Sequence, residues 1–88
     1  SETDRVIIVI DRVAERARNL KAQIEFMDAP AVCTATPATW QTKLGARRLA
    51  AIFLSADLPD GDRDGLLEDV GRLDPNVPIV LVDGDAHA

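Results

Sequence analysis

The stretch that decides the fold is RVIIVI at residues 5–10, which is followed by Asp11. Every side chain after the first is apolar and β-branched, so a strand formed here has no polar face. Such a strand suits the middle of a parallel sheet that helices cover on both sides. Three further apolar runs follow, at residues 31–35 (AVCTA), 49–54 (LAAIFL) and 77–82 (VPIVLV). The sequence therefore predicts four buried strands.

The segments between these runs have helical spacing. Residues 12–26 predict a helix, because one apolar stripe recurs at helical steps through Val13, Ala17, Leu20, Ile24 and Met27, with charged side chains such as Arg16 and Arg18 on the other faces. Thr36 and Pro37 suit the start of a short helix that ends at Leu44, with Gly45 as its cap. After a turn at residues 58–61 (LPDG), a third helix is marked by Leu66, Leu67, Val70 and Leu73. Strands alternating with helices predict an α/β fold with a three-layer parallel sheet.

Composition limits the functions to be expected. The 88 residues carry a net charge of −5 and predict one domain, residues 1–88. Residues 56–88 hold nine acidic and two basic side chains, so direct nucleic-acid binding is not expected. The apolar runs are too short to span a membrane, and the polar, acidic start is unlike a signal peptide. A single cysteine, Cys33, cannot form an internal disulfide. These features predict a cytoplasmic location.

Polar residues follow the predicted strands where a parallel sheet places its chemistry, at the carboxyl ends. Asp11 follows the first strand, Ser55 the third and Asp83 the fourth. This frame, with LPDG at residues 58–61, resembles the receiver domain of bacterial response regulators, a flavodoxin-like (CheY-like) fold. In that family an aspartate four residues before the proline accepts a phosphoryl group, an acidic pair follows the first strand, and Thr or Ser ends the fourth.

The chain departs from the receiver pattern at each chemical position. Ser55 stands four residues before Pro59, at the phosphoacceptor position, and has no adjacent base in the sequence. Asp11 is followed by Arg12, whose charge opposes a divalent cation beside it. Asp83 replaces the hydroxyl that would contact a phosphoryl group, and its carboxylate would repel one. The resemblance therefore implies a receiver fold that has lost aspartyl phosphorylation.

Each acidic residue also has a purely structural interpretation. Asp11 and Asp83 either form a residual acidic pocket or simply end their strands in solvent. The Asp57 side chain is expected to face water, and Asp60, Asp62 and Asp64 to stabilise a helix start. No glycine-rich phosphate loop, Ser-His-Asp set or Cys-His pair is present, which disfavours an enzyme. We expect no catalytic residue, metal site or cofactor in this domain, and a buried, packing role for Trp40.

A narrower resemblance follows from residues 6–11 (VIIVID), 15–20 (ERARNL), 39–40 (TW) and 77–83 (VPIVLVD). These stretches are similar to the receiver-like domains of the FleQ/FlrA-type flagellar master regulators, a branch of the sigma-54-dependent activators. The resemblance implies an amino-terminal regulatory module that controls an attached AAA+ ATPase domain and a helix-turn-helix domain. In that family the ATPase domain binds ATP and cyclic-di-GMP, so neither ligand is expected here. A degenerate receiver of another output class, acting as a protein-docking module, is the alternative.

The receiver fold normally continues through another helix, strand and helix, so we expect this sheet to be truncated after strand four. In the family's strand order the fourth strand would then lie at an edge. Its side chains are apolar on both faces, and an exposed apolar edge invites pairing with another chain. We therefore predict a homodimer with contacts at Val77, Ile79 and Leu81. Residues beyond this chain or the tail after residue 82 are the alternative cover for that edge.

Overall fold

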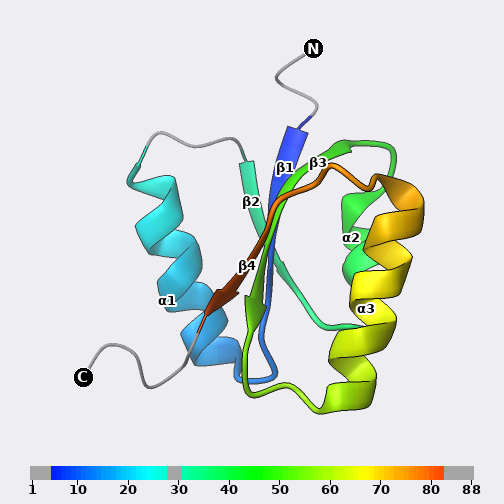
Figure 1. The fold of residues 1–88 in the computed structure, drawn as a ribbon. Helices are drawn as coiled ribbons and strands as arrows, with labels where there is room; N and C mark the ends of the chain where they lie inside the picture. The colour runs from blue at the N-terminus through cyan, green and yellow to red at the C-terminus, as the bar shows by residue number, and fades with distance from the viewer. Residues whose placement is uncertain (1–4, 28–30, 83–88) are drawn as a thin grey trace.

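A computed structural model describes residues 5–27 and 31–82. Strands and helices alternate along the chain as β1 (Arg5–Ile10), α1 (Ala14–Glu25), β2 (Ala31–Ala35), α2 (Trp40–Leu44), β3 (Arg48–Ser55), α3 (Asp60–Leu73) and β4 (Ile79–Val82). The strands form one parallel sheet in the order β2-β1-β3-β4. Helix α1 covers one face, and α2 and α3 cover the other (Figure 1). The predicted α/β, receiver-like three-layer sheet is confirmed, with β4 as the last strand in the described residues.

The core consists of two apolar clusters separated by the sheet. On one face Val6, Ile8 and Ile10 of β1 pack with residues of α2 and α3, namely Trp40, Leu44, Leu66 and Val70. On the opposite face Ile7 and Val9 pack with Ala17 and Ile24 of α1. Strand β1 is buried on both faces because its β-branched run supplies an apolar side chain to each cluster. Trp40 is 2% exposed, which confirms its predicted packing role.

Several predicted boundaries are wrong by a few residues, because the ends of elements extend beyond the core. Helix α1 begins at Ala14 rather than residue 12, and the stripe ends Val13 and Met27 are 41% and 69% exposed. Strand β4 begins at Ile79 rather than residue 77. These terminal apolar side chains have no opposing layer to bury them.

The start of α2 also differs from the prediction. Residues 36–39 form a turn, and the helix begins at Trp40 rather than after Thr36. The Thr36 carbonyl accepts hydrogen bonds from the backbone N–H groups of Thr39 and Trp40, both at 3.1 Å. Gly45 ends the helix as predicted, with φ of +60°, a conformation that favours glycine because it has no Cβ.

The sheet order brings the carboxyl ends of β1 and β3 together at its centre. The connection from β1 leads through α1 to β2 on one side, whereas β3 leads through α3 to β4 on the other. Functional sites of such sheets lie where neighbouring connections diverge in this way. In Figure 1 this end of the sheet lies at the bottom, beside the first turn of α1 and the β3–α3 loop.

Candidate functional site

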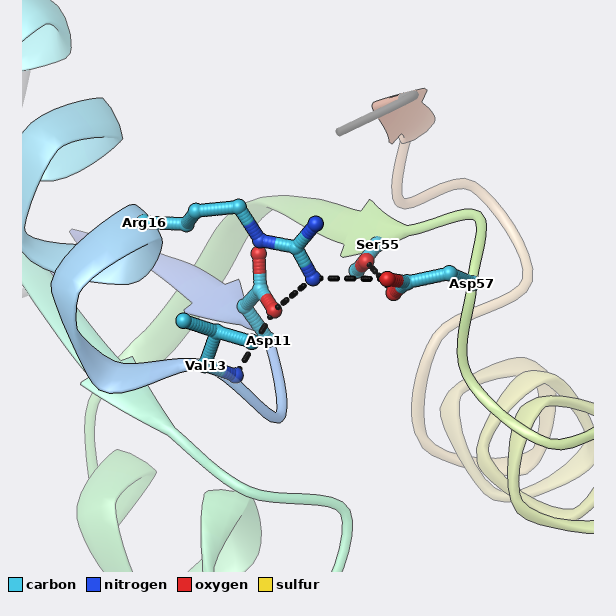
Figure 2. A network of polar contacts seen from close by, with 5 residues as sticks. All are labelled: Asp11, Val13, Arg16, Ser55 and Asp57. Carbon is cyan, nitrogen blue, oxygen red and sulfur yellow. Dashed lines mark hydrogen bonds and ion pairs between the residues drawn. The ribbon is translucent and has the colours of Figure 1, made fainter. Parts of the chain in front are cut away.

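An arginine joins two carboxylates at the carboxyl ends of the central strands. Nη2 of Arg16, in the first turns of α1, lies 2.9 Å from Asp11 Oδ1 and 2.7 Å from Asp57 Oδ2. Figure 2 shows the guanidinium group extended between the two acids, with Ser55 behind Asp57. Both hydrogen bonds come from one nitrogen, whose two N–H groups suffice for one bond to each acid. We call Asp11, Arg16, Ser55 and Asp57 the carboxyl-end cluster.

Local backbone geometry fixes the Asp11 side of this cluster. The Val13 N–H donates a hydrogen bond of 2.9 Å to Asp11 Oδ1, which closes an Asx turn between β1 and α1. The same oxygen accepts the hydrogen bond from Arg16. The Asp11 side chain is 12% exposed, so it is part of a polar pocket and does not simply end β1 in solvent.

The other side of the cluster is formed by the end of β3 and the loop after it. Ser55 is the last residue of β3 and is 3% exposed. Its hydroxyl donates a short hydrogen bond to Asp57 Oδ1, while Asp57 Oδ2 accepts from Arg16. Both carboxylate oxygens of Asp57 are therefore engaged. The Asp57 side chain is 49% exposed, as expected, but its contacts with Ser55 and Arg16 were not predicted.

The contacts within the cluster favour its charged form. The hydrogen bond from Ser55, followed by the one from Arg16, lowers the pKa of Asp57 below its ordinary value of 3.8. The hydrogen bonds to Asp57 and then to Asp11 raise the pKa of Arg16 above its ordinary value. The cluster therefore pairs one guanidinium group with two carboxylates.

These charges decide how well the cluster fits a divalent cation. Receiver chemistry brings Mg²⁺ to carboxylates at this end of the sheet, and Mg²⁺ prefers carboxylate oxygens and water. Here a guanidinium group lies against both carboxylates and adds a positive charge beside any metal bound there. Across residues 5–27 and 31–82, no group of three or more His, Cys, Asp or Glu side chains could hold a metal ion. The cluster as built does not fit a metal.

Comparison with known proteins identifies the family of this chain. A family model described as flagellar regulatory protein FleQ matches residues 6–88. The chain belongs to this family. No curated protein and no solved structure gives a significant match. The FleQ match covers the whole described fold, so the resemblance stated from the sequence is confirmed, and the family is one of regulators rather than of enzymes.

The structure places most of the predicted site residues of this FleQ-family chain. Ser55 and Asp11 lie at the ends of adjacent central strands, as their positions in the sequence implied. The prediction that Ser55 has no neighbouring base is wrong, because Asp57 accepts its hydroxyl hydrogen. That carboxylate is a weak base, since its pKa is lowered and its other oxygen binds Arg16. Asp83 lies outside the described residues.

The sequence argument also missed an arginine. It assigned the cation opposing a metal to Arg12, which is exposed and makes no ion pair with a described residue, although its charge lowers the pKa of Asp57. Arg16 makes the direct contacts, although its place off the apolar stripe of α1 had suggested a solvent-facing side chain. An arginine in the first turns of a helix that follows a strand-ending aspartate was the available signal, because that turn lies beside the carboxyl ends of the strands.

Two of the three predicted dimer contacts, Ile79 and Leu81, lie on the outer strand of the described sheet. Ile79 and Leu81 are 37% and 58% exposed, and Val80 between them is 41% exposed. Apolar side chains therefore point to both faces of β4 without being covered by the described residues. Val77 precedes the strand and packs partly against the core, so it contributes less free surface than the other two.

No helix in the described parts of the chain is long and apolar enough to cross a membrane.

Proposed function

We propose that this chain is a phosphorylation-independent, receiver-like regulatory domain that acts through protein contacts. In the parent protein it dimerises and controls an attached sigma-54-dependent AAA+ activator of flagellar and biofilm genes. The family match supports a role in flagellar regulation. The observation that supports phosphorylation independence is the Arg16 guanidinium between Asp11 and Asp57.

The argument from Arg16 is electrostatic. Phosphoryl transfer to an aspartate needs Mg²⁺ to neutralise the incoming charge. In this chain an internal cation is already paired with both carboxylates, and its hydrogen bonds are made without any ligand. The receiver position four residues before Pro59 also holds a hydroxyl, that of Ser55, which is buried and cannot form an acyl phosphate. The domain therefore keeps one conformation at this end of the sheet, and its output depends on what its surface contacts.

Self-association is the contact that the surface favours. Among the described residues β4 pairs only with β3, so its outer side offers backbone groups for pairing, and its side chains are apolar on both faces. Pairing with β4 of a second chain satisfies those groups and covers Ile79, Val80 and Leu81. A dimer formed this way sets the distance between any domains attached to the two chains. The assembly in the cytoplasm is thus a homodimer in which no direct nucleic-acid or membrane contact involves this domain.

Two measurements test the proposal. Incubation with acetyl phosphate and Mg²⁺, followed by intact mass spectrometry, should leave the mass unchanged; a gain of one phosphoryl group on an aspartate contradicts phosphorylation independence. Sedimentation at micromolar concentrations should show a dimer that Leu81→Lys converts to a monomer. The control is Phe26→Lys, since Phe26 is 92% exposed at the end of α1, away from β4. A natural chain that sediments only as a monomer contradicts dimerisation.

A further inference from the structure

A groove lies at the opposite end of the sheet from the carboxyl-end cluster. It has a volume of about 600 Å³ and is bounded by the amino ends of β1 and β3 and by the connection from α3 to β4. In Figure 1 this end lies at the top, where β1 begins and α3 ends. Its volume is within the range of protein sites that bind ligands or short peptide segments.

Three arginines surround this groove. Arg5 and Arg48 are register partners on adjacent strands, and Arg47 precedes Arg48 in the chain. Like charges directly opposite one another on neighbouring strands are destabilising. Within residues 5–27 and 31–82 none of the three forms an ion pair. The fold therefore keeps a concentration of positive charge here at a cost in stability, although the whole chain is acidic.

One of these arginines is held in place by the end of α2. Arg47 Nη2 donates hydrogen bonds to the Lys43 carbonyl at 2.5 Å and to the Cys33 sulfur at 3.6 Å, and Nε donates to the Leu44 carbonyl at 3.3 Å. These bonds fix the guanidinium group without neutralising its charge, because carbonyl and thiol partners are uncharged. Because the Arg47 side chain is already held in place, binding an anion beside it would cost little side-chain entropy.

The groove is also partly apolar. Leu73, at the end of α3, is 55% exposed, and Leu49 and Val77 are only partly buried against the core. Pro78 lines the same surface and has no N–H group to leave unsatisfied. The one carboxylate in the lining is that of Asp74, whose Oδ1 accepts a hydrogen bond of 3.0 Å from the Asn76 N–H. The lining thus combines a positive rim with an apolar floor.

We propose that this groove binds an acidic segment of a partner protein that also presents an apolar side chain. Arginine binds carboxylates through paired hydrogen bonds. Arg5 and Arg48 therefore bind the acidic side chains of the partner segment. Leu73 and Val77 take the apolar side chain between them. Nucleic acid is disfavoured as the occupant because no aromatic side chain lines the groove to stack on a base. This surface lies away from the carboxyl-end cluster and shares only Val77 with the predicted dimer contacts, so the inference does not depend on the proposed function.

The test uses three eight-residue peptides and the amide NMR spectrum of the 88-residue chain. The first contains six glutamates and two leucines; in the second glutamine replaces each glutamate, and in the third alanine replaces each leucine. The first should shift amides around Leu49 and Leu73. The double variant Arg5→Gln/Arg48→Gln should weaken its binding by about tenfold or more, since each charged contact contributes roughly that factor. Arg18→Gln, which removes a charge from an exposed position on α1, should leave the affinity unchanged.

Each remaining outcome also decides the matter. Weaker binding of both analogues supports a site that reads charge and an apolar side chain together. No shifts with the first peptide at millimolar concentration, or shifts confined to Val80 and Leu81 on β4, overturn the proposal. Equal losses from Arg18→Gln and from the double variant show only general charge attraction and overturn it too. Binding of inorganic phosphate or a single-stranded oligonucleotide as tightly as the first peptide assigns the groove to another ligand.

Discussion

Replacing Arg16 with glutamine is expected to turn the carboxyl-end cluster into a weak divalent-cation site. Glutamine keeps a hydrogen-bond donor, but it is shorter than arginine and carries no positive charge. The cluster then changes from one positive and two negative charges to two negative charges alone. Asp11 and Asp57 lie on opposite sides of the position that Nη2 now occupies, at 2.9 and 2.7 Å from it. In the variant that position is open to a metal ion with bound water.

The size of the effect follows from the number of ligands. Mg²⁺ is commonly held by one or two carboxylates plus water, and sites with few charged ligands bind divalent cations with Kd on the order of 1 mM. At about 10 mM Mg²⁺ such a site would stabilise the folded chain by about 1.4 kcal/mol through ligand linkage. For a domain of this size, that corresponds to a rise in Tm of roughly 5–10 °C.

The assay is thermal unfolding followed by circular dichroism, with and without MgCl₂ at matched ionic strength. The natural chain should show no Mg²⁺-dependent change in Tm, and Arg16→Gln should show the rise given above. Arg18→Gln is the matched control, because it removes the same charge from an exposed position on α1 and Arg18 forms no ion pair with a described residue. Adding Asp57→Asn to Arg16→Gln should abolish the response. The reasoning is refuted if Arg16→Gln does not respond to Mg²⁺, or if the natural chain responds equally.

Three further outcomes are expected from the structure. Because the pKa of Asp57 is lowered on folding, its contribution to stability is present above pH 3.8 and is lost as the pH falls below that value. When the free energy of unfolding in urea is measured against pH, Asp57→Asn should therefore reduce the loss of stability at acid pH. Trp40→Ala should lower the free energy of unfolding, measured by urea denaturation, by about 3–5 kcal/mol. That is a large part of the roughly 4–13 kcal/mol expected for a domain of this length. Arg48→Gln should raise the same free energy by about 0.2–1 kcal/mol by removing the repulsion from Arg5, while Arg18→Gln should change it less.

The sequence was sufficient for the fold because its strongest signals are those that the core uses. The β-branched run at residues 5–10 supplies both apolar clusters, and the middle of the α1 stripe, at Ala17 and Ile24, is buried as its spacing predicts. The signal fails at element ends, where position relative to the other layer decides burial. Val13 and Met27 continue the stripe but extend past the sheet and are exposed.

The candidate site was only half predictable, for a related reason. Asp11 and Ser55 were found because strand ends can be located from apolar runs. Arg16 and the direction of the Asp57 side chain were missed, because they depend on how the first turn of α1 approaches the β3–α3 loop. Periodicity separates apolar from polar positions on a helix, but it does not distinguish a polar side chain in solvent from one that crosses to another element.

The carboxyl-end cluster and the outer strand are connected through the end of β3. Ser55 is the register partner of Val82 on β4, and the Ala56 N–H donates a hydrogen bond of 2.8 Å to the Val82 carbonyl. The residue that hydrogen-bonds Asp57 therefore also helps to position β4. Because Arg16 holds Asp57 to α1, the loop after β3 is fixed from both sides without any ligand. A domain that works by presenting β4 needs this loop to stay in place. The internal ion pair meets that requirement.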